Sequence, residues 1–399
     1  MQNLQRFIRG DKIIWLILLF LTLISILEVY SSIGKIAFEK MGGRTTSLLI
    51  RHIIIIFSGY FVILCVSNIK YTVFSALSKY GFYICIPLLL ATFIFSLSGK
   101  AAGRWLELPI IGQFQPSEIA KMVIVVYTAR ALTLKQDVVK NLSTFRELLI
   151  PVAIIAALIF PENFSTAALI FLVCFLLMFI GGVRFKYWIS TLGMGIVTLL
   201  IAFLFIFPNV DMFRSGTWGN RIEEYLAKDM NAYTQVNIAK TAIAGGGIFG
   251  EKPGGTIQGR LLSESHNDFI YAVIIEELGF VGGVAILLLY LWLFYRCMRI
   301  AFKAEGLFAA YASVGLGLLI FIQALVNMGV AVNLLPVTGQ TLPFISYGGT
   351  SFLFTSISLG IILSISSEVQ KKEDSEKINE SEELAREDML AKEKMTGSI

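Results

Sequence analysis

The sequence predicts an all-α polytopic membrane protein with about ten transmembrane helices and one large extracytoplasmic loop between spans seven and eight. Hydrophobic residues make up 56% of the 399 residues, and charged residues only 15%. The hydrophobic residues form repeated runs, several of them long enough to cross about 30 Å of hydrocarbon at about 1.5 Å per residue. This pattern excludes a soluble domain, and the net charge of +5 gives no reason to expect a nucleic-acid partner.

The predicted spans are apolar runs separated by short polar or basic segments. They cover residues 13–31, 50–67, 80–98, 117–134, 147–160, 165–183, 187–207, 268–297, 306–330 and 345–367. The fourth run contains Lys121 and Arg130, so this helix should line protein or water rather than lipid. Only residues 161–164 separate the fifth and sixth runs, which is typical of a tight hairpin.

The spans divide the chain into three parts. Residues 1–12 form a cytoplasmic N-terminal segment, residues 13–367 form the membrane domain, and residues 368–399 form a charged tail. The first part is basic but lacks a small-residue cleavage site, so we interpret it and the first span as an anchor rather than a removed signal peptide. The tail is nearly free of aromatic residues and is expected to be a solvated helix or disordered. We assign it no chemistry, and a partner-binding role is the alternative.

Basic residues in the short loops predict that both termini face the cytoplasm. The loops at 161–164 and 331–344 contain no Lys or Arg, whereas the loops predicted to lie inside carry several. The loop at 32–49 is an exception because it is also basic. The balance places the large loop, 208–267, outside the cell, and Asp268 at the outer face of the membrane.

Asp268 is the residue that points most directly to chemistry. It follows a polar stretch that contains His266, one of only two histidines, and it precedes a long apolar run. An acidic side chain at the centre of a span costs about 2.5–3.5 kcal/mol on insertion scales and less near the interface, so such a residue is a functional candidate. The alternative is a helix N-cap, because Asp caps helices well and favours the positive end of the helix dipole.

The predicted outer loop is rich in glycine and in basic residues. Gly245, Gly247 and Gly250 satisfy the spacing G-x-G-x-x-G, but no strand precedes them. We therefore interpret them as flexible turns rather than as a dinucleotide site, and they are compatible with a glycine-lined approach for a bulky ligand. Arg260 is one of several loop cations that could contact phosphates or, alternatively, anionic lipid headgroups.

A polar group at the start of the fourth span lies on the same predicted side. Arg104 and Trp105 precede a segment, 115–121, that begins a helix with proline. Within it, Glu118 and Lys121 are three residues apart and can share one helix face. An internal ion pair that holds a short span is the alternative to a ligand-binding role.

Two further polar groups fall on this side. The hairpin at 162–166 contains Asn163, for which simple turn chemistry is the alternative. The run at 335–351, which contains Ser346 and Tyr347, is too rich in proline and glycine for a regular helix. Irregular backbone at membrane depth must be buried in protein or line a cavity.

Taken together, these blocks resemble the SEDS family (shape, elongation, division and sporulation proteins) over essentially residues 10–367. The run at 335–351 resembles the family signature, and the blocks at 115–121 and 266–279 resemble two more. The order of the spans and the outer loop before span eight also match. The segment 339–343, Gly-Gln-Thr-Leu-Pro, is more similar to the division type than to the elongation type.

The resemblance implies a peptidoglycan glycosyltransferase of the bacterial cytoplasmic membrane that polymerises lipid II at the outer face, for septal wall synthesis in division. By position, Asp268 matches the family's essential acidic residue, and Lys121, Glu118 and Asn163 match other cavity residues. The implied partners are a class B penicillin-binding protein and other division membrane proteins. The remaining residues expected to bind substrate are His266, Arg104, Trp105, Arg260, Ser346 and Tyr347.

Two departures from the family pattern matter. The family usually has Asp in a Pro-Asp-x-Gly-Thr hairpin, and Asn163 stands in that place here, next to Glu162. The family often has Thr between the His and the Asp of the next block, where this chain has Asn267. The first departure argues against a charge-based role for the hairpin, whereas the second preserves the spacing of His266 and Asp268.

The chemistry of sugar transfer requires these residue types. A base must take a proton from an acceptor hydroxyl as it attacks an anomeric carbon, and a positioned carboxylate contributes about 10²–10⁴-fold in rate. The pyrophosphate leaving group needs positive charge from Lys, from Arg or from a divalent cation such as Mg or Mn. Asp268 can supply the base, and Lys121 with a loop arginine can supply the charge. A single carboxylate rather than a flanking pair argues against an ordinary glycosidase.

Three alternatives stay open. An elongation-type polymerase differs only in its cellular role. A lipid-precursor flippase or transporter would also contain ionisable residues in its spans, such as Glu28, Glu276 and Glu277, although we find no inverted repeat between the two halves. A non-catalytic scaffold would use the charged tail as its working part.

Overall fold

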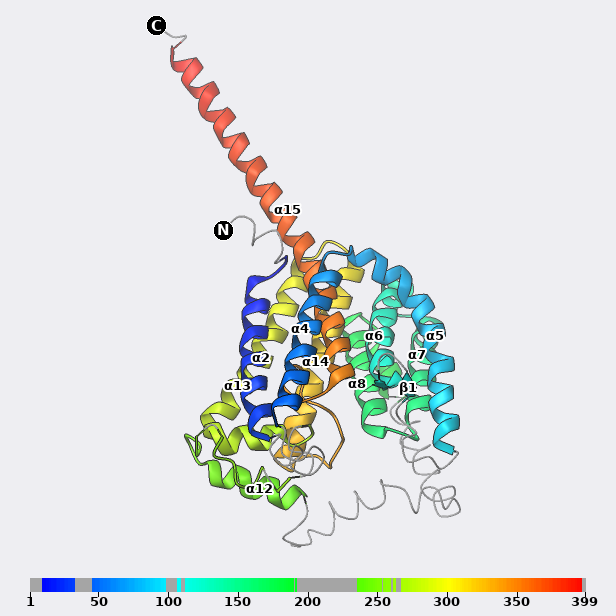
Figure 1. Cartoon of the computed structure of the whole chain (residues 1–399). Coiled ribbons are helices and arrows are strands. Elements are labelled where there is room, and N and C mark those ends of the chain that lie inside the picture. The colour runs from blue at the N-terminus through cyan, green and yellow to red at the C-terminus, as the bar shows by residue number, and fades with distance from the viewer. Residues whose placement is uncertain are drawn as a thin grey trace.

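The computed structural model shows long helices standing side by side, which confirms the all-α membrane class (Figure 1). It describes residues 9–32, 45–97, 106–108, 112–189, 191, 235–252, 254–259, 261–262 and 267–396. In this part of the chain one short antiparallel hairpin joins β1 (Leu106–Leu108) to β2 (Gly112–Phe114). The hairpin leads directly into the helix that carries Lys121, so it fixes the entry to the candidate site.

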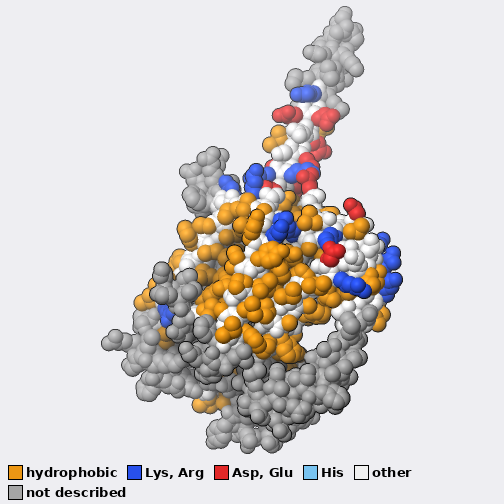
Figure 2. Space-filling model, turned by 90° about the vertical axis from the view of Figure 1, so that its right-hand side faces the viewer, with side chains coloured by type: hydrophobic (Ala, Val, Ile, Leu, Met, Phe, Trp, Pro, Cys, Tyr) orange, Lys and Arg blue, Asp and Glu red, His pale blue; other side chains and the backbone are white. Residues whose placement is uncertain are grey.

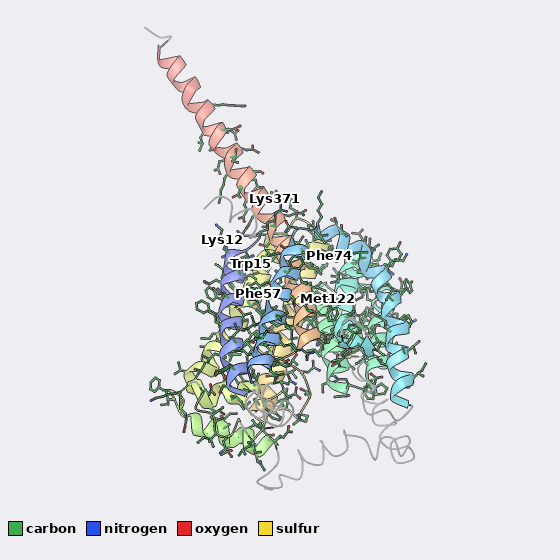
Figure 3. All side chains as sticks on the ribbon, in the orientation of Figure 1. Lys12, Trp15, Phe57, Phe74, Met122 and Lys371 are labelled. Atoms are coloured by element: carbon green, nitrogen blue, oxygen red, sulfur yellow. The ribbon has the colours of Figure 1, made fainter. Side chains whose placement is uncertain are left out.

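The first three helices carry much of the exposed apolar surface. They are α2 (Lys12–Ser32), α4 (Thr45–Ser67) and α5 (Tyr71–Leu97). Phe57 of α4 is 70% exposed, and its position on the outside of the bundle is labelled in Figure 3. Hydrophobic side chains cover the flank of the molecule below a charged rim (Figure 2). An apolar surface of this extent is expected to contact lipid.

The next helices are shorter. They are α6 (Pro116–Leu134), the one-turn 3₁₀ helix η1 (Gln136–Val138), α7 (Leu142–Ile159) and α8 (Phe164–Ile180). Pro116 occupies the first turn of α6, where a missing N–H costs nothing and the fixed φ angle favours helix. The predicted start of this helix is therefore confirmed.

The last helices include the two longest. They are α12 (Gln235–Gly246), α13 (Ile270–Lys303), α14 (Leu307–Ala331) and α15 (Gly349–Thr396). α13 is broken at Gly279, where φ is 71° and ψ is −175°. Such a conformation is accessible mainly to glycine, so the break is specified by this residue.

Most predicted spans coincide with described helices. The exception is the run at 187–207, most of which lies outside the described residues. Seven helices of the described part are long and apolar enough to cross a membrane, and α8 is a shorter apolar helix. The predicted total of ten spans therefore stays a prediction. The charged tail continues α15 as an exposed helix, which agrees with the first of the two expectations for it.

α14 lies at the centre of the bundle. It packs against α6, α8, α13 and α15, and polar side chains such as Gln323 and Asn327 are buried along it. α12 packs against α13 at the end of the bundle opposite Lys12 and Lys371 (Figures 1 and 3). The start of α13, with Asp268 before it, is therefore at the end away from the charged tail.

Candidate functional site

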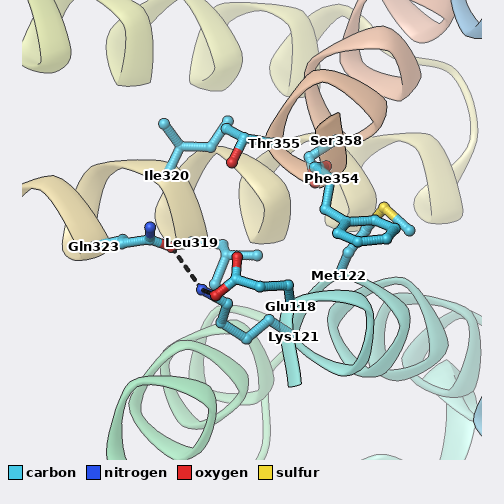
Figure 4. Close-up of a pocket in the computed structure, with 9 residues that line it drawn as sticks. All are labelled: Glu118, Lys121, Met122, Leu319, Ile320, Gln323, Phe354, Thr355 and Ser358. Atoms are coloured by element: carbon cyan, nitrogen blue, oxygen red, sulfur yellow. Dashed lines mark hydrogen bonds and ion pairs between the residues drawn. The ribbon is translucent and has the colours of Figure 1, made fainter. Parts of the chain in front are cut away.

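The site begins at the first turn of α6, where a buried cation is held by two side chains. The Lys121 ammonium lies 2.8 Å from Glu118 Oε1 and donates to Gln323 Oε1 of α14 at 3.0 Å (Figure 4). Lys121 is 2% exposed. An ammonium carries three donors, and the hydrogen bonds between described residues use two of them. The predicted ion pair is confirmed, and no described residue accepts from the third donor.

A small pocket adjoins this pair. Figure 4 shows α6, α14 and α15 contributing its walls. Its polar lining includes Thr355 and Ser358 of α15, and its apolar lining includes Met122 and Phe354. The pocket thus lies where three helices that are distant in sequence bring polar side chains together.

Gln323 connects the cation to the irregular segment between α14 and α15. Its amide Nε2 donates to the Thr341 carbonyl oxygen at 3.0 Å, while its Oε1 accepts from Lys121. Because the Nε2 group donates to Thr341 and the Oε1 atom accepts from Lys121, the orientation of the amide is fixed. Lys121 and the segment at 332–348 are therefore held in one hydrogen-bonded arrangement.

The run predicted to be irregular, 335–351, is irregular as far as Gly349, where α15 begins, and most of its residues from 338 to 346 are buried, whereas Leu334 and Leu335 are exposed. φ is positive at Asn333, Gly339 and Phe344, with values of 58°, 69° and 63°. Phe344 is 2% exposed and Ile345 is fully buried. The Leu342 N–H donates to Ser346 Oγ at 2.8 Å. The Leu342 N–H and the carbonyl oxygens of Gln340 and Thr341 thus have partners within the protein, which irregular backbone at membrane depth requires.

Asp268 lies against this segment. Its Oδ2 atom is 3.7 Å from the place that a Cβ atom of Gly339 would occupy. Asn327 of α14 donates from Nδ2 to the Asp268 carbonyl oxygen at 3.1 Å and to the Gln340 carbonyl oxygen at 2.7 Å. One amide therefore ties the start of α13 to the irregular segment, and the Asp268 side chain is only partly exposed.

Helix capping does not account for Asp268. The N-cap position of α13 is Phe269, and the helix start has no side-chain capping bond. Asp268 lies one residue earlier, before the helix begins. The alternative that its carboxylate serves as the N-cap is therefore wrong, because the chain enters the helix one residue later than a cap at Asp268 requires.

Asn163 does have a capping role. It is the N-cap of α8, and its Oδ1 accepts the Thr166 N–H at 3.1 Å. The Thr166 hydroxyl in turn accepts from Gln340 Nε2 at 2.7 Å. The amide at this position therefore performs the turn chemistry considered as the alternative, and the same hairpin supports the irregular segment through Thr166.

Ser346 and Tyr347 point in different directions. The Ser346 hydroxyl donates to the Asn267 carbonyl oxygen at 2.8 Å, next to Asp268. Tyr347 lies against His52 of α4, with 5.5 Å between ring centroids. Of the two, Ser346 is thus bound to the backbone beside Asp268. Four predicted site residues lie outside the described residues: Arg104, Trp105, Arg260 and His266.

We name the connected side chains the polar wall. Its members come from α6, α8, α14 and the segment at 332–348, and they are Glu118, Lys121, Asn163, Thr166, Gln323, Asn327, Gln340, Thr341 and Ser346. Gln323 was not predicted from the sequence. Its signal was an amide one helical turn before Asn327 in a mostly apolar span, where an amide is costly unless it is hydrogen-bonded.

The described residues contain no group of three or more His, Cys, Asp or Glu side chains placed to hold a metal ion. Mg²⁺ is commonly bound through one or two carboxylates together with substrate phosphates. The divalent cation expected from the sequence stays a proposal.

The sequence matches the FtsW, RodA and SpoVE family, described as cell cycle proteins, over residues 11–371. The probable peptidoglycan glycosyltransferase FtsW of Geobacter metallireducens is 34% identical over 376 residues, covering 92% of this chain and 97% of the relative. The peptidoglycan glycosyltransferase MrdB of Escherichia coli is 31% identical over 362 residues, covering 89% of this chain and 93% of the relative.

Solved structures share the fold. One chain from a peptidoglycan synthase complex that coordinates polymerization and crosslinking aligns with a TM-score of 0.70 at 23% identity, covering 88% of this chain and 97% of that chain. The rod shape determining protein RodA of Thermus thermophilus aligns with a TM-score of 0.59 at 22% identity, covering 88% and 95%. Because the family matches residues 11–371, most of the length of this chain, the chain belongs to the FtsW, RodA and SpoVE family of cell cycle proteins.

Proposed function

We propose that this chain is a peptidoglycan glycosyltransferase that polymerises lipid II into glycan strands at the outer face of the cytoplasmic membrane. Relatives that align over nearly their whole length are named for this activity, and the division type is the more frequent name among them. The observation that carries the proposal is the position of Asp268 against the irregular segment that the polar wall supports.

Asp268 acts as the general base. Its carboxylate takes the proton from the acceptor sugar hydroxyl, the hydroxyl oxygen bonds to the anomeric carbon, and the bond from that carbon to the pyrophosphate oxygen breaks. The tie between Asn327 and the Asp268 carbonyl oxygen fixes the backbone, so the carboxylate can be aimed without reorganisation. A positioned base of this kind contributes about 10²–10⁴-fold in rate.

Lys121 supplies positive charge to the anionic substrate. Its unused donor is directed by Glu118 and Gln323, which occupy the other two directions. In a buried site a charge of this kind interacts more strongly with a phosphate than it does in water. A bound Mg²⁺ or Mn²⁺ would add charge at the pyrophosphate, and Asp268 is the carboxylate that would share it.

Partners and cellular context follow from the same relatives. A structural neighbour belongs to a complex that couples polymerization with crosslinking, which supports a class B penicillin-binding protein as the partner of this chain. Other division membrane proteins are further expected partners. The basic-loop pattern supports cytoplasmic termini in a multi-pass protein of the inner membrane.

Purified chain given labelled lipid II tests the proposal and separates the alternatives. Glycan strands that are digested by a muramidase are the expected product. Movement of labelled lipid II across a vesicle bilayer without glycan would indicate a flippase. Neither product, in the presence of the partner transpeptidase and Mg²⁺, would indicate a scaffold and would overturn the proposal.

A further inference from the structure

The glycine-rich stretch after α12 packs closely onto the break in α13. A Cβ atom added at Gly246 would meet the Ile275 carbonyl oxygen at 1.9 Å, and one at Gly250 would meet the Glu277 carbonyl oxygen at 2.1 Å. Two N–H groups just after the break at Gly279 donate to carbonyl oxygens of this stretch at 2.9 and 3.2 Å. The glycines do form turns, but they also permit a backbone contact that side chains would prevent.

The turn that follows donates four hydrogen bonds to the carboxylate of Glu276. Glu276 Oε1 accepts the N–H groups of Ile257 and Gln258, each at 2.9 Å. Glu276 Oε2 accepts the Gly259 N–H at 3.1 Å and the Thr256 hydroxyl. We call this arrangement, Glu276 with residues 256–259, the loop anchor.

The loop anchor leaves Glu276 little capacity for a ligand. Two carboxylate oxygens accept about four hydrogen bonds, and four are made within the protein. Glu276 is only 4% exposed. Successive backbone N–H groups that converge on one anion form a nest, and here the anion is a side chain of the neighbouring helix. Glu276 is therefore bound as a fixed part of the loop.

The loop anchor packs against the first turns of α13, which begins directly after Asp268. Gly259 is held by Glu276 and lies so close to Val273 that an added Cβ atom would be 3.1 Å from it. The Val273 N–H donates in turn to the carbonyl oxygen of Phe269, the residue after Asp268, at 3.4 Å. The turn therefore contacts the part of α13 that carries Asp268 at its start.

We infer that Glu276 is a positioning residue that holds the turn at 256–259 against α13 and thereby sets the geometry at Asp268. The link to activity rests on the proposed glycosyltransferase function, whereas the anchoring of the turn does not. Glu276→Gln tests both parts. The amide keeps the size of the side chain but replaces one acceptor oxygen with an NH₂ group and removes the charge, so the four hydrogen bonds to Glu276 cannot all be kept.

Hydrogen exchange measures the anchoring directly. In the purified chain, Glu276→Gln should speed the exchange of the amides at 257–259 by about tenfold, because the turn loses one acceptor oxygen and the charge that strengthens its remaining hydrogen bonds. Glu251→Gln is the matched control, since Glu251 is an exposed carboxylate of the same loop, and it should leave exchange unchanged. Unchanged exchange in Glu276→Gln would overturn the anchor.

Thr256→Val is the second variant, in case Glu276→Gln folds poorly. It removes one donor to Glu276 and one of the two acceptors of the Gly259 N–H, and it should speed exchange to a smaller extent. If both variants fold and neither shows faster exchange at 257–259, the anchor is also overturned.

Lipid II turnover measures the coupling to Asp268. For Glu276→Gln we expect kcat to fall by about tenfold while KM changes by less than about threefold. The Asp268 carboxylate would no longer be held in its reactive position, whereas the contacts that bind substrate would remain. Faster exchange with normal kcat would overturn the positioning role. An inactive unmodified chain would instead refute the proposed function, and the exchange result would still decide the anchor.

Discussion

The polar wall and the loop anchor meet at the start of α13 and use polar groups in opposite ways. In the polar wall, side chains from helices far apart in sequence pair with one another, and Lys121 keeps a donor for a ligand. In the loop anchor, backbone N–H groups of one turn use the capacity of Glu276. Burial alone therefore does not distinguish a reactive polar group from a structural one. The two roles differ in whether the buried group has hydrogen-bonding capacity that the protein itself does not use.

Asp268→Asn gives the largest expected effect and tests the reactive side of the comparison. The amide keeps the size of the side chain but cannot accept the proton, so polymerisation should fall by about 10²–10⁴-fold. Turnover of lipid II is measured in detergent at matched amounts of folded protein. Asp137→Asn, an exposed aspartate of η1, is the control and should keep normal turnover. Activity of Asp268→Asn within a few-fold of the unmodified chain would remove the base assignment.

Lys121 gives the next effect, because its charge can serve either the fold or the substrate. Lys121→Ala leaves the Glu118 side chain, which is only 11% exposed, without its partner, and breaking a buried pair typically destabilises a protein by about 3–5 kcal/mol. The double variant Lys121→Met with Glu118→Gln removes both charges and should recover most of that stability. We expect it to stay inactive in turnover assays, since the substrate still lacks the cation.

Lys140→Met controls for the loss of a lysine, because this residue is exposed. Thermal unfolding in detergent measures the stability of each variant. Recovery of both stability and activity in the double variant would show that the pair is structural only.

Gly246→Ala tests the close contact on the loop side. Its added Cβ atom would lie 1.9 Å from the Ile275 carbonyl oxygen, whereas a Cβ atom at the neighbouring Gly245 meets nothing within 4 Å. Overpacking of this kind costs about 1–3 kcal/mol. We expect faster hydrogen exchange at 247–259 in Gly246→Ala and no change in Gly245→Ala. Equal behaviour of the two variants would contradict the docking of this stretch on α13.

Asn163 gives the smallest expected effect and tests the support behind the polar wall. Asn163→Ala removes the cap of α8 and should lower stability by about 1 kcal/mol. Asn163→Asp should retain stability, since Asp and Asn are comparable N-caps. Both variants should polymerise lipid II at near-normal rates, measured alongside thermal unfolding. A large loss of activity in Asn163→Asp with normal stability would instead place this side chain at the substrate.

The features that depend on neighbours along the chain could be predicted from the sequence alone. Apolar runs located the helices, since a span must satisfy its backbone internally and face lipid with apolar side chains. Pro116 marked the start of α6, and the spacing of Glu118 and Lys121 predicted their ion pair. The proline and glycine content of 335–351 likewise predicted irregular backbone buried in protein.

Contacts between residues that are distant in sequence could be identified only from the tertiary structure. The hydrogen bond from Lys121 to Gln323 joins residues about two hundred positions apart, and no local pattern encodes that distance. The glycines before α13 looked like flexible turns because sequence reports permitted backbone angles, not what packs against them. Glu276 resembled an intramembrane charge of a transport pathway until the turn at 256–259 supplied its donors. A carboxylate's role depends on which donors reach it, and folding alone brings them together.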